Sequence, residues 1–144
     1  MADEFKGKYA RLFPNKVSTS SLITALILYI LDRQDGEPLY GQEIADRIAA
    51  HTEKRDRLTD KIIFEGYQIS RGVLYDALSE LEEAGMITGE WLNSYGRPTN
   101  KKARRYWRIL PSGKEHLKFL IESNRHPYEE AMYNLKRIGD VLFK

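Results

Sequence analysis

Residues 70–113 read SRGVLYDALSELEEAGMITGEWLNSYGRPTNKKARRYWRILPSG, and this stretch decides the fold. It begins with a helix whose two ends are encoded locally. Ser70 can cap the free amide groups of a first turn, and Gly85 can take the left-handed conformation that closes a last turn. The sequence therefore predicts a helix from Arg71 to about Ala84.

The predicted helix has an apolar side and a polar side. Its apolar residues recur three and four positions apart, on one stripe that faces a core: Leu74, Ala77, Leu78 and Leu81. Arg71, Tyr75 and Ser79 fall on a different side. Because Glu82 and Glu83 lie at the far end, only the N-terminal half can approach a polyanion without repulsion between like charges. Helices that read DNA use that half.

Two short strands around a basic loop follow the helix. Residues 87–92 and 104–110 have strand character, and residues 93–103 between them are rich in Gly, Pro and Asn, which predicts a β-hairpin. No Asp or Glu occurs from Gly96 to Pro111, whereas the loop and its exit carry Arg97, Lys101, Lys102, Arg104, Arg105 and Arg108. A solvated turn would explain such a loop in isolation. Directly after a capped helix, we favour contact with DNA phosphates, where each neutralised charge releases a counterion.

The composition is that of one folded domain. A chain of 144 residues with 42% hydrophobic content and a net charge of +2 can bury one core and is neither disordered nor globally basic. The absence of cysteine excludes disulfides and thiolate metal sites. The first 16 residues lack the apolar segment of a signal peptide, and the longest apolar run, residues 22–31, is too short to span a bilayer. We therefore expect a soluble cytoplasmic protein with no membrane partner.

Three further segments precede the deciding stretch, after a short N-terminal arm expected over residues 1–17. Residues 22–31 are apolar over most of a helical circumference, as in a central helix. A second helix is predicted from Gly41 to about His51. Between Thr52 and Gly66, charges of both signs are mixed with apolar residues, and we interpret this segment as a long, partly ordered connection. The winged part of the chain is expected to span residues 18–112.

Residues 113–144 are expected to form helices with an apolar stripe. Pro127 is predicted to kink or restart the helix, because it lacks an amide donor. The stripe consists of Leu117, Leu120, Ile121, Tyr128, Met132, Leu135, Ile138 and Leu142, and its second part repeats near 3.5 residues. The stripe either covers the core of its own chain or forms a homodimer interface. We favour the homodimer, because a single winged module has a small core and little use for a second long terminal helix.

Several blocks of the chain resemble the signature of the PadR family of bacterial transcriptional regulators. These blocks are PLYGQEI (38–44), SRGVLYDAL (70–78) with Leu81-Glu82 and Gly85, GRP (96–98) and YWRILPSG (106–113). The resemblance covers roughly residues 22–120. It implies a winged helix-turn-helix, dimerisation through C-terminal helices, and repression of a promoter that a small molecule relieves. The chain departs from the family's usual residues at Gln42, Asp76 and Pro111.

The candidate DNA contacts lie at the starts of two helices and in the basic loop. They are Tyr40, Gln42, Ser70, Arg71, Gly72, Tyr75, Asp76, Arg97, Lys101, Lys102, Arg104 and Arg105. Arg71 is the best candidate for a base edge or phosphate, with a local salt bridge as the alternative, and Tyr75 is expected to donate to a phosphate. Gly72 either allows close approach of its backbone or is merely tolerated near a helix end. Of Tyr106 and Trp107, one is expected to pack on the core and the other to face outward.

Catalytic and cofactor sites receive little support from the sequence. His51, His116 and His126 lie far apart without the spacing of metal ligands, and no phosphate-binding glycine loop is present, so we expect no metal, no cofactor and no enzyme. A small aromatic effector is a weaker expectation from the family resemblance. Tyr29, Phe119, Tyr128 and Tyr133 are available to line its cavity.

The chain is therefore expected to be mainly α-helical with a small β-hairpin (α+β), a winged helix-turn-helix with C-terminal dimerisation helices. As a homodimer it would bind a pseudo-palindromic site in double-stranded DNA and regulate transcription, most simply as a repressor. Two alternatives stay open at this point. The same fold could bind another protein through the basic loop, or it could organise DNA architecturally, as a replication-terminator-like protein does.

Overall fold

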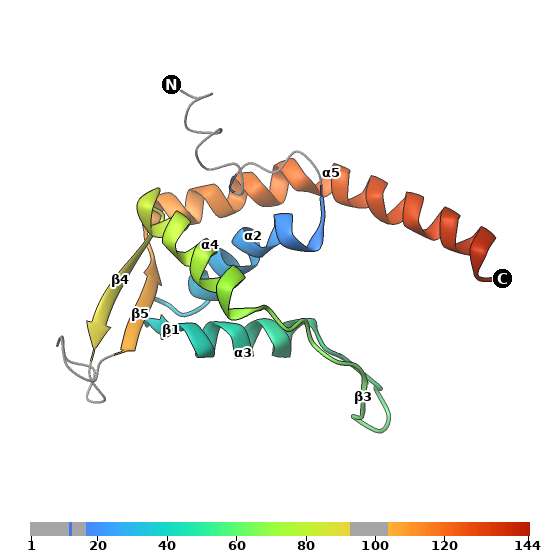
Figure 1. The fold of residues 1–144 in the computed structure, drawn as a ribbon, viewed down its shortest axis with the longest axis horizontal. Helices are drawn as coiled ribbons and strands as arrows, with labels where there is room; N and C mark the ends of the chain where they lie inside the picture. The colour runs from blue at the N-terminus through green and yellow to red at the C-terminus, as the bar shows by residue number, and fades with distance from the viewer. Residues whose placement is uncertain (1–11, 13–16, 93–103) are drawn as a thin grey trace.

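The computed structural model of the chain describes Leu12, residues 17–92 and residues 104–144, apart from the side chain of Ser20. The predicted loop 93–103, with Arg97, Lys101 and Lys102, lies outside the described residues, as does most of the N-terminal arm. The elements are α2 (Thr19–Asp32), β1 (Leu39–Tyr40), α3 (Gly41–Thr52), β2 (Lys54–Arg55), β3 (Ile62–Phe64), α4 (Arg71–Glu83), β4 (Ile87–Leu92), β5 (Arg104–Ile109) and α5 (Pro111–Leu142). The mainly helical class with a small antiparallel sheet is thus confirmed (Figure 1).

Helix α2 lies at the centre of the core, as its all-round apolar sequence predicts. Ser18 begins it with a capping box: its hydroxyl accepts from the Ser21 amide, and the Ser21 hydroxyl accepts from the Ser18 amide. The buried apolar residues of α2 are Ile23, Ile27, Leu28, Ile30 and Leu31. Helix α5 crosses over α2, α3 lies beneath it, α4 runs beside it, and the sheet closes one end (Figure 1).

The sheet has three strands in the order β1-β5-β4 rather than the two of the predicted hairpin. Strands β4 and β5 pair antiparallel from Ile87 opposite Ile109 to Leu92 opposite Arg104, which confirms the hairpin. The short β1 pairs with β5 on its other edge, with Leu39 opposite Trp107. Trp107 is buried in the core and Tyr106 is half-buried on the other side of the strand, as their alternation predicts.

Helix α4 begins and ends where the sequence predicts. The Ser70 hydroxyl accepts a hydrogen bond of 3.2 Å from the Val73 amide, and Gly85 follows the helix with a φ of +76°. The whole predicted stripe, Leu74, Ala77, Leu78 and Leu81, is buried. The orientation of α4 is thereby fixed by one apolar side.

The interpretation of residues 52–66 as a partly ordered connection is wrong. Strands β2 and β3 pair antiparallel and form a hairpin that projects from the end of α3 (Figure 1). Its turn is held by Asp56, whose carboxylate accepts from the amides of Leu58 and Thr59. Such a turn depends on local hydrogen bonds rather than on an apolar pattern. The mixed charges of this segment therefore gave no periodic signal from which the hairpin could be predicted.

Of the two outcomes predicted for Pro127, a kink or a restart, the restart is excluded, since α5 is one helix of 32 residues that contains Pro127. The carbonyl of Ser123, which loses its usual amide partner, belongs to an exposed residue, so that water can satisfy it. The first half of α5 packs on the body through Gly113, Leu117 and Leu120. Its second half extends beyond the body (Figure 1). Among the described residues, no helix is long and apolar enough to cross a membrane.

His116 joins the start of the chain to α5. Its Nε2–H donates to the carbonyl oxygen of Leu12 at 3.1 Å, and its ring stacks on Phe119. Burial lowers the pKa of His116, although the bond to Leu12 acts in the opposite direction. Below its ordinary pKa of about 6.5, the imidazole therefore takes up a proton in the unfolded chain before it does so in the folded chain.

We expect the free energy of unfolding to fall as the pH is lowered from 7.5 to 5.5, because proton uptake by His116 favours the unfolded chain in that window. Urea denaturation at a series of pH values measures this. The His116→Gln variant retains an amide donor but does not titrate, so its free energy of unfolding should fall less over the same pH range. An equal fall in the free energy of unfolding of the wild type and of His116→Gln over this pH range would contradict the assignment.

Candidate nucleic-acid interface

A groove of about 760 Å³ lies between the start of α3, one side of α4 and the sheet. Six of the predicted DNA-contact residues line it: Tyr40, Gln42, Arg71, Tyr75, Arg104 and Arg105. They come from three separate segments of the chain, and the fold brings them together. Asp46, Gln68, Ser79, Glu82 and Trp91 also line the groove and were not predicted as contacts.

The start of α3 forms one wall. Tyr40 precedes the helix, and its amide donates to the Glu43 carboxylate at 3.2 Å, which satisfies one of the free groups of the first turn. Gly41 lies directly against Tyr75: a Cβ at this position would be 2.5 Å from the phenol oxygen. The side chain of Gln42 donates to Asp46 at 2.8 Å. The glycine therefore allows α3 and α4 to approach each other at the groove.

The first half of α4 forms the second wall. Residues one turn apart on this helix, Arg71, Tyr75, Ser79 and Glu82, all border the groove. The Arg71 guanidinium lies 5.6 Å from the centroid of the Tyr75 ring. Gly72 is exposed, and a Cβ there would meet nothing within 4 Å, so close packing within the chain does not explain this glycine. Ser70 and Asp76 are exposed nearby but do not line the groove.

The start of β5 forms the third wall. The Arg104 guanidinium lies 4.5 Å from the centroid of the Tyr40 ring, which also packs edge-to-face on Tyr106. Arg105 forms an ion pair with Glu82 and lies 4.9 Å above the Trp107 ring. Glu82 additionally accepts from the Gly89 amide at 3.2 Å. Arg105 thus couples the sheet to α4, a structural role that the sequence reasoning did not assign to it.

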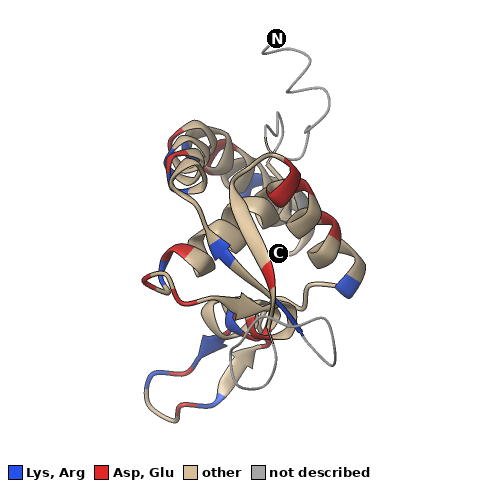
Figure 2. Ribbon diagram, turned by 90° about the vertical axis from the view of Figure 1, so that its left-hand side faces the viewer, with Lys and Arg blue, Asp and Glu red and all other residues tan. Residues whose placement is uncertain are grey.

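Two arginines of the groove have no ion pair within the part of the chain that the structure describes. Glu82 is paired with Arg105, whereas the contacts of Arg71 and Arg104 there are with aromatic rings, which do not neutralise a guanidinium charge. Figure 2 shows how charge is distributed along α4, with a basic residue at its start and acidic residues farther along. The N-terminal end of the helix adds a partial positive charge. This arrangement can hold the oxygen atoms of phosphates or base edges.

A second, apolar recess lies between α2 and the projecting half of α5. It has a volume of about 610 Å³, and its lining includes Leu22, Leu26, Tyr29, Thr52, Tyr67, Ile121, Tyr128, Met132 and Leu135. Of the aromatic residues expected at an effector cavity, Tyr29 and Tyr128 line this recess. Phe119 stacks on His116, and Tyr133 lies exposed beneath Arg137, so neither belongs to the lining.

The residues predicted for a dimer interface divide into two sets. Leu117 and Leu120 are buried in the core of their own chain. The remaining six, Ile121, Tyr128, Met132, Leu135, Ile138 and Leu142, are exposed along α5. In the part of the chain that the structure describes, no group of three or more His, Cys, Asp or Glu residues is placed to hold a metal ion.

Comparison with known proteins identifies relatives of this arrangement. A model of the transcriptional regulator PadR-like family matches residues 27–119. A transcriptional regulator from Clostridium thermocellum is 24% identical with a TM-score of 0.55, over 84% of this chain and 96% of that one. No curated protein matches the chain.

Two further solved structures have the same fold. A PadR family transcription regulator from Clostridium difficile is 20% identical with a TM-score of 0.52, over 85% of this chain and 99% of that one. A PadR-like transcriptional regulator from Bacillus cereus is 23% identical with a TM-score of 0.50, over 79% and 90%. The winged helix-turn-helix fold is thereby confirmed.

Removal of the carboxylate at Glu82 should loosen the sheet from α4. Glu82→Ala leaves Arg105 without its ion-pair partner and the Gly89 amide without its acceptor, so we expect the free energy of unfolding to fall by about 1–2 kcal/mol in urea denaturation. Glu90→Ala removes an exposed carboxylate from the same sheet and should change the free energy of unfolding by less than about 0.5 kcal/mol. Equal losses in the two variants would argue against this coupling.

Proposed function

The chain belongs to the transcriptional regulator PadR-like family, and on that premise we propose that it is a homodimeric repressor that binds a pseudo-palindromic operator in double-stranded DNA. One observation carries the proposal. Arg71 and Arg104 line a groove built from both helices of the helix-turn-helix and from the sheet, and the contacts found for both among the described residues are with aromatic rings. A guanidinium held this way keeps its charge for phosphate or guanine.

The proposed docking follows from the charge polarity of α4. Its first half enters the major groove, so that Arg71 reaches a base edge or phosphate and Tyr75 donates its phenol to the backbone. Gly72 lets the helix backbone approach the DNA closely, and Asp76 accepts from cytosine or penalises a wrong base. The acidic far end of α4, with Glu82 and Glu83, stays outside the groove.

The basic loop completes the proposed DNA contact as the wing. Arg97, Lys101 and Lys102 would follow the neighbouring phosphates, or enter the minor groove beside the helix. Arg104, at the start of β5, lies where this loop joins the groove. The wing therefore supplies affinity that is independent of sequence, while α4 supplies the base contacts.

The proposed dimer uses the projecting half of α5. Tyr128, Met132, Leu135 and Ile138 are large, exposed and spaced near 3.5 residues, the pattern of a seam between two helices. A two-fold axis through this seam relates two copies of α4, so that they meet half-sites about 34–36 Å apart. The domain division that follows is a DNA-binding part over residues 18–112 and a dimerisation region over residues 113–144.

The proposed effector site is the apolar recess beside α2. The second helix of the dimer would close its open side, and Tyr29 and Tyr128 would offer ring faces to a flat aromatic molecule. Binding there would shift the spacing of the two copies of α4 and so release the operator.

Arg71 and the loop lysines should affect DNA binding differently. With a duplex enriched from a random pool, Arg71→Ala should weaken specific binding by about 1–3 kcal/mol and leave binding to random duplex nearly unchanged. The Lys101→Ala, Lys102→Ala double variant should weaken binding to both duplexes and flatten the salt dependence. Anisotropy titrations at several salt concentrations measure both effects. Lys118→Ala, on an exposed side of α5, is the control. If Lys118→Ala lowered the affinity for DNA as much as the loop variant does, the wing assignment would be refuted.

A charge placed in the α5 seam should separate the dimer. Leu135→Glu buries two carboxylates at the proposed two-fold interface, and we expect sedimentation to show monomers whose affinity for the two-half-site duplex is reduced by about 100-fold. Lys136→Glu introduces the same charge one position farther along the helix and should remain dimeric. A dimeric Leu135→Glu protein with full affinity would rule out this seam.

A further inference from the structure

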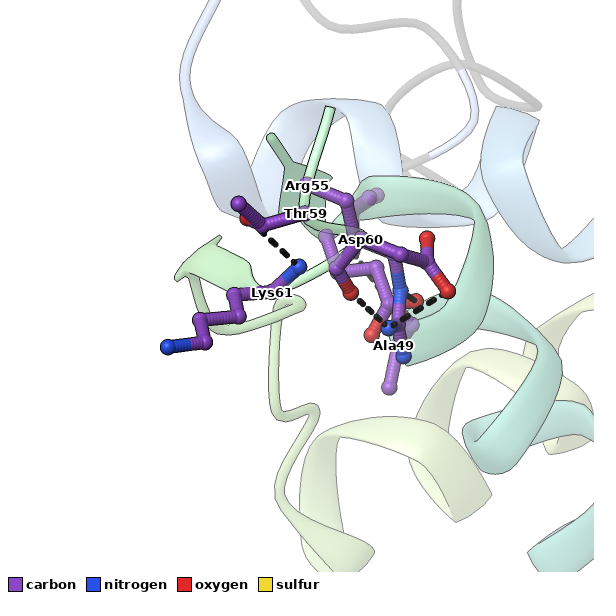
Figure 3. Close-up of polar contacts among 7 residues, drawn as sticks. Ala49, Arg55, Thr59, Asp60 and Lys61 are labelled. Carbon is purple, nitrogen blue, oxygen red and sulfur yellow. Dashed lines mark hydrogen bonds and ion pairs between the residues drawn. The ribbon is translucent and has the colours of Figure 1, made fainter. Parts of the chain in front are cut away.

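The β2–β3 hairpin is an ordered ribbon whose shape is fixed by polar contacts. Asp56 donates its amide to the Lys61 carbonyl at 2.8 Å, and hydrogen bonds from the turn amides of Leu58 and Thr59 lower the pKa of its carboxyl group. Arg55 donates to the Asp60 carbonyl at 2.8 Å and pairs with Glu53 at 2.7 Å (Figure 3). The hairpin therefore holds a defined surface outside the body of the molecule.

Much of that surface is apolar. Leu58 at the tip is 96% exposed and Phe64 on β3 is 65% exposed, while Ile62 and Ile63 beside it are also exposed. Apolar side chains gathered on one exposed element are typical of a contact with another protein. Contact with nucleic acid is disfavoured, because the four cations of residues 53–65 are matched by four carboxylates.

The base of the hairpin is fixed beside the apolar recess. Thr52 donates its hydroxyl to the Ile48 carbonyl at 2.7 Å and accepts from the Tyr67 amide at 2.7 Å, so that both ends of the hairpin are tied to α3. Gly66 passes so close to Ala49 that any side chain there would collide with its carbonyl. Thr52 and Tyr67 line the recess together with Ile121 of α5. The base of the hairpin thus borders a recess that α5 also lines.

The end of α5 offers a matching apolar surface. Leu142 is 66% exposed and Phe143 is 83% exposed, and Val141 is exposed beside them. The helix is still ordered at this point, because the Phe143 amide donates to the Gly139 carbonyl at 2.8 Å. The hairpin and the free half of α5 extend from the same side of the body (Figure 1).

The position of the C-terminal end of α5 in a dimer follows from the way in which two copies of the helix would pair. If two copies of α5 pack antiparallel about the middle of residues 128–135, Leu142 of one copy lies beside Ile121 of the other. Ile121 is the residue of α5 that shares the recess with Thr52 and Tyr67. An end delivered to this position lies at the edge of the recess below the hairpin and leaves its interior free for an effector, and β3 is then the nearest exposed apolar strand.

We infer that the hairpin clasps the C-terminal end of α5 of a second copy of this chain, with Ile62 and Phe64 covering Leu142 and Phe143. This inference rests on the proposed homodimer and adds a second contact to its helix seam. Each chain carries one hairpin and one helix end, so a two-fold axis forms two identical clasps, as an isologous interface requires.

The absence of cysteine from the chain permits a direct crosslinking test. Phe64→Cys and Leu142→Cys are made separately, reduced, mixed in equal amounts to exchange subunits, and treated with diamide. Facing positions in a clasp lie within the roughly 7 Å between Cα atoms that a disulfide requires. We expect a covalent dimer in the mixture and none in either variant alone. Leu58→Cys, at the tip beyond the paired strands, mixed with Leu142→Cys is the matched control and should not crosslink.

A second measurement reports the contribution of the clasp. The Ile62→Ser, Phe64→Ser double variant should raise the dimer dissociation constant about tenfold in sedimentation equilibrium, because apolar area is lost at both clasps. Leu58→Ser should change it by less than about twofold. The far-ultraviolet spectrum and the unfolding midpoint of each variant establish that the fold is retained.

The outcomes separate this inference from the function on which it rests. A wild-type chain that is monomeric at micromolar concentration would overturn the proposed dimer and the clasp together. A dimer that neither crosslinks through Phe64→Cys nor weakens on loss of Ile62 and Phe64 would overturn the clasp alone. Unchanged dimerisation with weaker DNA binding in the serine variant would assign the hairpin to DNA instead, and would likewise overturn the clasp.

Discussion

Leu74, Ala77, Leu78 and Leu81 lie along one side of α4 and are buried in the same core as α2, so the helix has a single stable orientation. The free energy gained by burying this stripe, of the order of 2 kcal/mol for each large side chain, far exceeds that of any surface contact of the helix. Burial of this stripe also fixes where the residues on the opposite side of α4 point. Arg71 and Tyr75 must face the groove, and the start of α4 must lie beside the start of α3. The binding surface is thus positioned by the core, which it meets at Leu74 and Trp107.

The sheet is held to this helix by a second, polar constraint. Trp107 anchors β5 in the core, and Arg105 extends from the same strand to Glu82 near the end of α4. Since β5 is fixed at this point, Arg104 one residue earlier projects beside Tyr40 at the groove rather than into the core. An arginine that serves the structure therefore lies next to one that keeps its charge free. Their different roles could not be distinguished by charge alone.

The sequence was sufficient to predict an element wherever its apolar residues are strongly periodic or its ends carry capping residues. Ser70, Gly85 and the stripe of α4 predicted that helix almost to the residue. The alternation of Tyr106 and Trp107 predicted that one of the two rings is buried, although not which one. The features that could not be predicted from the sequence are those that depend on non-local contacts or on weak local ones. The hairpin over residues 53–65 depends on the hydrogen bonds of Asp56 and Arg55, which have no periodic signature. The pairing of Arg105 with Glu82 joins residues 23 positions apart. Pro127 does not end the helix, because water, rather than the chain, can satisfy the carbonyl that it leaves free.

In the proposed dimer, the core of each copy presents the cationic start of its α4 to a single DNA duplex. Hydroxyl-radical footprinting on a duplex enriched from a random pool tests this most directly. The predicted result is two protected patches of backbone related by a two-fold axis and separated by one DNA turn, with the intervening major grooves shielded from methylation at guanine. A single unsymmetric patch, or an enrichment that yields no common sequence, would contradict it.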